Sequence, residues 1–231
     1  MTITLYELAG AEPERRFSPY CWRARMALAH KGLAVETVPW RFTDKPAIAF
    51  SGQGKVPVLV DGGKTVFDSW TIADYLEATY PDRPKLFAGP GERALAKFVS
   101  AWNDTVVQAG LFRLVVLDIW SHAAEQDKDY FRKSREERIG MSLEAFCADR
   151  DAKIAAFRQS LAPLRVTLQG QPYLAGAAPD YADYVVFGAF QWARCISPIQ
   201  LLAADDPIAA WRGRLLDAFD GLAGRAVGYA C

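Results

Sequence analysis

The 231-residue sequence has little histidine and little cysteine. Its two histidines, His30 and His122, are far apart, and its four cysteines lie at positions 21, 147, 195 and 231. This spacing fits neither a metal site nor a disulfide framework, and a Ser–His–Asp triad is not expected. Net charge is also missing, because 27 basic residues balance 27 acidic ones. We therefore expect no metal, no nucleic-acid partner and no anionic membrane surface as a partner.

Long apolar runs are missing as well. No stretch of about 18 apolar residues could cross a membrane. The first residues, MTITLYELAG, lack the basic and apolar regions of a signal peptide. The sequence therefore predicts a cytoplasmic protein with reduced cysteines. Hydrophobic residues make up 51% of the chain, which is enough for a sizeable core.

The first 80 residues alternate between strand and helix patterns. β-branched and aromatic residues predict strands at 3–8, 33–40, 56–61 and 64–69, and Gly62-Gly63 predicts a hairpin between the last two. Helices are predicted at 18–31, 43–50 and 69–80. Ser18 and Ser69 are the expected N-caps of the first and third helices. The order β-α-β-α-β-β-α indicates a small α/β domain at residues 1–80.

The rest of the chain has a helical pattern. Proline and glycine in PDRPKLFAGPGE predict a linker at 81–91, followed by an all-α domain at 92–231. We expect helices at 91–122, 132–169 (broken near Gly140 and Pro163), 180–195 and 206–222. The mixed charges of FRKSREERIG at 131–140 favour a solvated helix face.

One segment of the helical half contains a cap signal. Asp180 precedes the apolar helix at 180–195, and Asp183 follows three residues later. This is the spacing of a capping box, in which each side chain accepts a backbone N–H. We interpret the pair as stabilising rather than catalytic.

The motif FSPYC, residues 17–21, has the spacing of a C-x-x-C redox motif whose first cysteine is Ser18. The second position of such a motif faces the core, where a thiol has a raised pKa and is inert. Cys21 is therefore interpreted as a packing residue. The alternative is a thiol that forms a mixed disulfide with a bound thiol.

Two further features of the first half indicate a peptide-like ligand. Pro57 begins a strand; from the residues alone we favour an ordinary trans bond, although a cis bond would leave the backbone of Val56 free to pair with a peptide. Asp68 and Ser69 lie where a strand meets a helix N-terminus, which attracts a carboxylate, and Asp68 can pair with an ammonium group. With Ser18, these features describe a pocket for a small thiol peptide.

The chain resembles the cytosolic glutathione S-transferases over nearly its whole length. FSPYCWRARMAL, KVPVLVDGG, DSWTIADYLEATYPDRP and PDYADY occur in the family's order and spacing. FSPYCWRARMAL and FRKSREERIG are most similar to the bacterial β-etherase branch of the family and to its fungal relatives, which have a serine at the catalytic position. That branch includes enzymes that cleave aryl ethers with glutathione and fungal relatives that bind polyphenols. The resemblance implies a thioredoxin-like first domain, a helical second domain and a homodimer.

The resemblance also implies roles for individual residues. Ser18 would be the catalytic serine that hydrogen-bonds the glutathione sulfur. Val56, before a cis Pro57, would pair with the cysteinyl backbone, and Asp68 and Ser69 would hold the γ-glutamyl end. Three side chains compete for the glycyl carboxylate: Lys45, Gln53 and Lys55.

The expected activity is transfer of glutathione, the co-substrate, to a small hydrophobic electrophile, either by conjugation or by β-aryl ether cleavage. The acceptor pocket should lie between the domains. Trp102, Phe112 and Trp120 are not assigned to it, since an aromatic residue is more often part of a core. Two alternatives stay open: a non-catalytic protein that binds aromatic ligands, and a thiol-disulfide reductase that uses Cys21.

Overall fold

The computed structural model describes residues 2–230, and its first part is built on a four-stranded sheet in the order β2-β1-β3-β4. The strands are β1 (Ile3–Leu8), β2 (Val35–Trp40), β3 (Val58–Asp61) and β4 (Lys64–Phe67). β1 and β2 are parallel, with Ile3 opposite Val35, and the other pairs are antiparallel. Gly62 and Gly63, which join β3 to β4, both have positive φ, as a tight hairpin requires. The predicted hairpin is confirmed.

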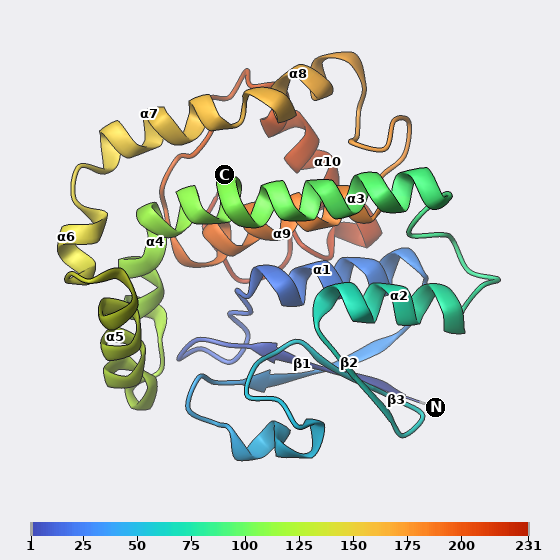
Figure 1. The fold of residues 1–231 in the computed structure, drawn as a ribbon, viewed down its shortest axis with the longest axis horizontal. Coiled ribbons are helices and arrows are strands. Elements are labelled where there is room, and N and C mark those ends of the chain that lie inside the picture. The colour runs from blue at the N-terminus through green and yellow to red at the C-terminus, as the bar shows by residue number, and fades with distance from the viewer. Residues whose placement is uncertain (1, 231) are drawn as a thin grey trace.

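Two helices cover the face of the sheet that is turned towards the rest of the molecule. α1 (Pro19–His30) and α2 (Ser69–Thr79) lie between the sheet and the helical part, whereas the 3₁₀ helix η1 (Pro46–Ser51) lies on the other side of the sheet (Figure 1). α1 begins where the sequence predicts, because Ser18 Oγ accepts the Cys21 N–H at 3.2 Å. The expected cap of α2 is wrong: Asp68 is the N-cap, and Ser69 is the first helical residue.

The remainder of the described chain is helical. The elements are α3 (Pro90–Trp102), the π-helical turn η2 (Asn103–Val107), α4 (Gln108–His122), α5 (Glu125–Ile139), α6 (Leu143–Cys147), α7 (Arg150–Ser160), α8 (Ala162–Gly170), α9 (Tyr181–Ile196) and α10 (Pro207–Gly221). The predicted helix at 91–122 is therefore almost continuous, and the break at Gly140 is confirmed. The fold class, an α/β thioredoxin-like domain followed by an all-α domain, is as expected.

The last predicted helix is shorter than its periodicity suggests. α10 leaves helical geometry at Ala218, and the next two residues have positive φ. The bend directs the ring of Phe219 towards His30 and Tyr184, with ring centroids 6.4 Å and 6.1 Å apart. A long-range aromatic contact thus overrides the local helical pattern.

α9 is the centre of the helical part. All of its residues except Arg194 are buried, as the nearly all-round apolar sequence predicts. Its capping box is complete: Asp180 Oδ1 accepts the Ala182 N–H at 2.7 Å, and Asp183 Oδ2 accepts the Asp180 N–H at 3.2 Å.

None of the helices within residues 2–230 combines the length and apolarity that crossing a bilayer would need.

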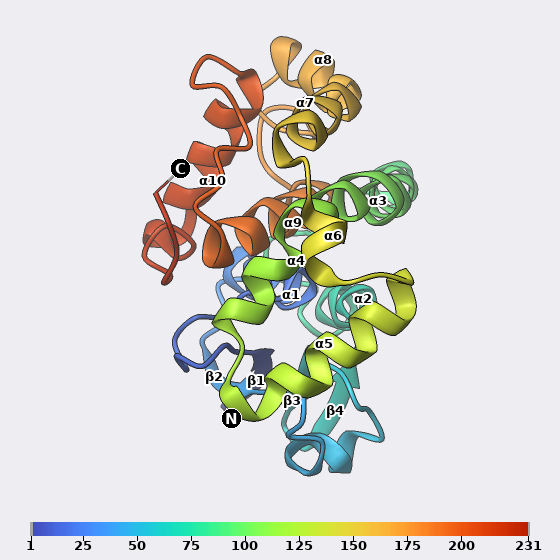
Figure 2. The same ribbon diagram turned by 90° about the vertical axis from the view of Figure 1, so that its left-hand side faces the viewer.

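α5 lies beside the sheet, below the other helices of the second half (Figure 2). Asp127 in its first turn is only 1% exposed and holds it there. The Asp127 carboxylate accepts hydrogen bonds from the backbone N–H of Phe42 at 3.0 Å and of Thr43 at 2.9 Å, and from the Thr43 hydroxyl at 2.6 Å. These bonds place α5 over the region where β2 ends.

Candidate functional site

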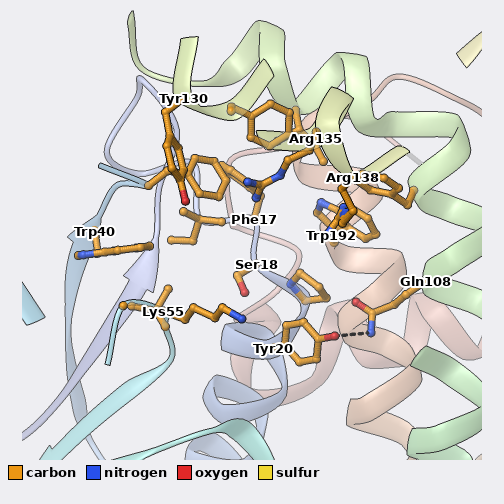
Figure 3. A pocket seen from close by; sticks show the side chains of 18 of the residues that line it. Phe17, Ser18, Tyr20, Trp40, Lys55, Gln108, Tyr130, Arg135, Arg138 and Trp192 are labelled. Atoms are coloured by element: carbon orange, nitrogen blue, oxygen red, sulfur yellow. Dashed lines mark hydrogen bonds between the residues drawn. The ribbon is translucent and has the colours of Figure 1, made fainter. Parts of the chain in front are cut away.

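A cavity of about 570 Å³ lies between the sheet domain and the helical domain (Figure 3). One side consists of the start of α1, the chain that follows β2 and the segment at 54–56. The other side consists of η2, α4, α5 and Trp192 of α9. Both sides combine aromatic and polar side chains, with two lysines (Lys45 and Lys55) on the loop side and two arginines (Arg135 and Arg138) on the helical side.

Ser18 lies on the wall of this cavity and is 4% exposed. Its Oγ is the acceptor in the bond from the Cys21 N–H, so the hydroxyl keeps its proton to donate. The position at the N-terminus of α1 adds the positive end of the helix dipole. A hydroxyl donor and a helix N-terminus together favour a bound anion such as a thiolate.

Cys21 lies one turn further along α1 and is buried, at 1% exposed. Burial is the main cause that raises the pKa of its thiol to about 12, and the charge of Glu7 adds to it. Cys21 is absent from the cavity wall. The interpretation of Cys21 as a packing residue agrees with this placement.

The Val56–Pro57 peptide bond is cis, so the trans bond favoured from the residues alone is wrong. Val56 lines the cavity, and Pro57 is buried behind it. Within residues 2–230, the backbone N–H and C=O of Val56 form no hydrogen bond. Free backbone groups at the edge of a pocket are what an extended peptide needs for pairing.

The three side chains expected to compete for a carboxylate are placed differently. Lys45 and Lys55 line the cavity, whereas Gln53 does not. Lys45 Nζ donates to the Gly54 carbonyl at 2.6 Å and lies 4.7 Å from the centre of the Trp40 indole. Lys55 is exposed and reaches into the pocket near Ser18 (Figure 3).

Asp68 and Ser69 lie outside the wall of the cavity, at the start of α2. Asp68 Oδ1 accepts the N–H groups of Trp70 and Thr71, each at 3.0 Å. Asp68 also has φ of 69° and ψ of 130°, a strained conformation for a residue with a side chain. Within residues 2–230, the second carboxylate oxygen of Asp68, Oδ2, accepts no hydrogen bond. The Ser69 N–H donates none to the same residues. A carboxylate oxygen and an amide are thus both without a partner at the start of α2.

Sequence reasoning missed a polar group that lines the same cavity as Ser18. Asp104, in the π-helical turn, accepts hydrogen bonds from Arg23 at 2.5 Å and from Gln108 at 2.5 Å. Gln108 also donates to the Tyr20 hydroxyl at 3.4 Å. The hydrophobic periodicity of residues 103–107 is that of an ordinary helix. A scan for interruptions within the predicted helix could have found this π-helical turn.

The expected solvated face at 131–140 is wrong for part of the segment. Lys133 and Glu137 are exposed, but Phe131 is buried, and Arg135 and Arg138 line the cavity. The physical reason is the docking of α5 by Asp127, which turns one face of the helix towards the sheet.

The helical side of the cavity includes the aromatic residues Phe112 and Trp192. Trp102 and Trp120, the other two aromatic residues left unassigned on the same stretch of helix, do not line it. In the described part of the chain, no group of three His, Cys, Asp or Glu side chains could hold a metal ion. The cavity therefore combines aromatic surface with basic side chains that attract an anion.

Comparison with known proteins gives the family of this architecture. Residues 13–84 match the family model described as the glutathione S-transferase N-terminal domain, and residues 94–219 match that of the C-terminal domain. The chain belongs to the glutathione S-transferase family. The expected family and its co-substrate, glutathione, are thereby confirmed.

Relatives and solved structures agree with this assignment. A probable glutathione S-transferase of Oryza sativa subsp. japonica is 26% identical over 220 residues, which are 89% of this chain and 84% of the relative. A glutathione transferase of Phanerochaete chrysosporium has a TM-score of 0.84 at 25% identity, covering 96% of this chain and 97% of that one. A glutathione S-transferase of Ceriporiopsis subvermispora, solved in complex with glutathione, has a TM-score of 0.81 at 24% identity, covering 95% and 97%, and shows the same fold.

Proposed function

We propose that this glutathione S-transferase activates the thiol of glutathione at Ser18 and transfers the sulfur to a hydrophobic, aromatic electrophile. The observation that supports the proposal most directly is the placement of the Ser18 hydroxyl at the N-terminus of α1, on the wall of the interdomain cavity. In the proposed complex, the Val56 backbone pairs with the cysteinyl residue. Ser69 and Asp68 hold the carboxylate and ammonium of the γ-glutamyl end. Lys45 and Lys55 are the candidates for the glycyl carboxylate.

A serine is sufficient for this role because the nucleophile belongs to glutathione. Lowering the pKa of a thiol by two units requires about 2.7 kcal/mol. A hydrogen bond to a charged group contributes roughly 1.5–3 kcal/mol, and a helix N-terminus adds up to about 1 kcal/mol. The hydrogen bond and the helix N-terminus together supply the required free energy without a histidine base.

The reaction is a substitution. The thiol proton leaves to solvent, the sulfur forms a bond to the electrophilic carbon, and the leaving group departs with its bonding electrons. In conjugation of an aryl halide the leaving group is halide. In β-aryl ether cleavage it is a phenolate, which then takes up a proton. Ether cleavage and the homodimer, which the family resemblance implies, stay predictions, and so does the cytoplasmic location predicted from the lack of an export signal.

The test is a comparison of Ser18→Ala and Cys21→Ala with the wild type, using glutathione with a nitro-activated aryl chloride, a model β-aryl ether or hydroxyethyl disulfide. We expect Ser18→Ala to lower the rate of aryl transfer roughly 10- to 100-fold, the loss of one hydrogen bond to a thiolate. Absorbance of bound thiolate should fall in parallel. Cys21→Ala should keep aryl transfer, because its thiol is buried and protonated.

Three outcomes would contradict the proposal. Full aryl transfer by Ser18→Ala would remove the catalytic assignment. Disulfide reduction that disappears only in Cys21→Ala would favour the reductase alternative. Glutathione and ligand binding without turnover of any of the three acceptors would favour a non-catalytic protein that binds aromatic ligands.

A further inference from the structure

Two arginines on one face of α5 reach into the helical side of the cavity. Arg135 is half-buried, and its guanidinium carbon lies 5.1 Å from the ring centre of Phe42 and 4.5 Å from that of Phe131. Arg138 lies 4.9 Å from the ring centre of Phe112. Figure 3 shows both side chains pointing into the pocket, with Arg135 on the side of Ser18 opposite to Lys55.

Neither arginine has a carboxylate partner among residues 2–230. Arg135 donates to the Ser134 hydroxyl at 2.8 Å, and Arg138 makes no ion pair. Arg132, one turn earlier on the same helix, instead pairs with Glu136 at 2.9 Å and with Glu144 at 2.8 Å. Unlike Arg132, the two cavity arginines therefore have no carboxylate to neutralise their charge within the described residues.

Two carboxylates of the same helix are engaged elsewhere. Glu136 also accepts the Leu143 N–H, and Asp127 holds the backbone after β2. Asp104, the acidic residue on the cavity wall, pairs with Arg23. The cavity thus has four basic side chains, Lys45, Lys55, Arg135 and Arg138, against one carboxylate that is internally neutralised.

The surroundings of Arg135 disfavour the charged form of its guanidinium when no anion is bound. Burial, and then the charge of the nearby Arg138, lower the pKa of its guanidinium. Stacking on aromatic rings occupies the faces of the guanidinium but leaves its edge, where the N–H donors lie. A planar carboxylate binds such an edge through two parallel hydrogen bonds, and it would neutralise the repulsion between the two arginines.

We propose that the acceptor electrophile of this enzyme is an aromatic carboxylate, whose anionic group binds to Arg135 and Arg138 while its ring packs against Phe112 and Trp192. This inference rests on the proposed function, because it places the acceptor on the helical side and glutathione on the loop side. The two lysines of the loop side are sufficient for the single glycyl carboxylate. The arginines are then left for the second substrate.

The experiment uses a pair of electrophiles that differ in charge: 4-chloro-3,5-dinitrobenzoate and its methyl ester. Glutathione displaces chloride from both, with a carbon–sulfur bond formed and a carbon–chlorine bond broken. For the wild type, kcat/KM for each is divided by its uncatalysed rate constant. We expect the corrected value to be roughly tenfold higher for the acid than for the ester, as for a charge-assisted hydrogen bond.

Arg135→Met and Arg138→Met should each reduce this preference, and the double variant should abolish it, mainly through KM for the acid. Arg138→Lys should restore part of it, since the charge remains but the paired donors are lost. The matched control is Lys133→Met, which removes the same charge from the same helix at an exposed position outside the cavity. It should keep the preference of the wild type.

A second readout does not depend on turnover. Quenching of tryptophan fluorescence in the glutathione-loaded protein reports binding of 4-nitrobenzoate and of neutral 4-nitrobenzamide. Tighter binding of the anion, lost in the double variant, is the expected result.

Normal turnover of the ester without any acid preference would overturn this inference and leave the proposed function intact. A rise in KM for glutathione in the arginine variants, with the acid preference unchanged, would assign the arginines to glutathione instead. Absence of turnover with both electrophiles would remove both proposals.

Discussion

At the scale of single residues, Asp180 connects the stability of the fold to pH. It caps α9 and is 8% exposed. Burial, and then the charge of Asp183, raise the pKa of its carboxyl from 3.8 to about 6. Because the folded state binds this proton more tightly than the unfolded state, the group stabilises the fold at low pH. That contribution is lost as pH rises through about 6.

Asp180→Asn should remove this pH dependence while keeping an oxygen that accepts the Ala182 N–H. Between pH 4 and pH 7, the free energy of unfolding of the wild type should fall relative to that of the variant by about 1–2 kcal/mol. Urea unfolding at several pH values measures the difference, and Asp82→Asn, on an exposed loop, is the control. Parallel curves for wild type and Asp180→Asn would contradict the assignment.

Residues with a local signal were predictable, and those that depend on distant partners were not. Ser18, the Gly62-Gly63 hairpin and the Asp180–Asp183 capping box follow from short-range rules, and the structure has all three. The predicted N-cap of α2 is wrong because aspartate and serine are equally favoured there, and only the hydrogen bonds to Trp70 and Thr71 identify Asp68 as the cap. The residues expected to hold glutathione stay predictions.

At the scale of elements, the docking of α5 decides the shape of the acceptor side. The element itself is partly visible in the sequence, where the charge pattern predicts a helix. Its position is not visible, because Asp127 binds backbone groups of Phe42 and Thr43 more than 80 residues earlier in the chain. Sequence periodicity reports a face of a helix but not the surface against which that face packs.

Asp127→Ala should release α5 from the sheet domain. The substitution leaves two buried N–H groups without their acceptor, and we expect a loss of about 2–3 kcal/mol in the free energy of unfolding. Hydrogen exchange should accelerate in α5 and in the segment at 42–43. Asp129→Ala, an exposed carboxylate on the same helix, should change neither measurement. Unchanged exchange in α5 of Asp127→Ala would show that the aromatic contacts of Phe131 alone hold the helix.

At the scale of the whole molecule, the two parts of the chain are joined by direct contact as well as by a linker. Arg23 of α1 pairs with Asp104 of η2 at 2.5 Å. The connecting chain is also fixed: the Leu86 N–H donates to Glu77 at 2.7 Å, and the Leu86 carbonyl accepts the Tyr181 N–H at 3.1 Å. A cavity between two parts held in this way has walls of fixed separation, which suits a site that must align two substrates.

α9 lies close against α1 in this junction. A Cβ atom at Gly188 would lie 2.5 Å from the backbone oxygen of Pro19, the residue that follows Ser18. Gly188→Ala should therefore push α1 away from α9, lower the free energy of unfolding by about 1–3 kcal/mol and displace Ser18 from its place in the cavity. We expect a fall in kcat/KM for aryl transfer that is larger than the loss of folded protein explains.

Gly213→Ala is the matched control, because a Cβ atom there would meet no neighbour within 4 Å and the residue lies in the regular part of α10. Alanine is favoured over glycine in a helix by up to about 1 kcal/mol, so this variant should be as stable as the wild type or more stable. Urea unfolding and transferase kinetics on both variants separate the two cases. If Gly188→Ala kept both stability and activity, the junction between α9 and α1 would accommodate the added methyl group. The position of Ser18 would then not depend on the contact between the two domains.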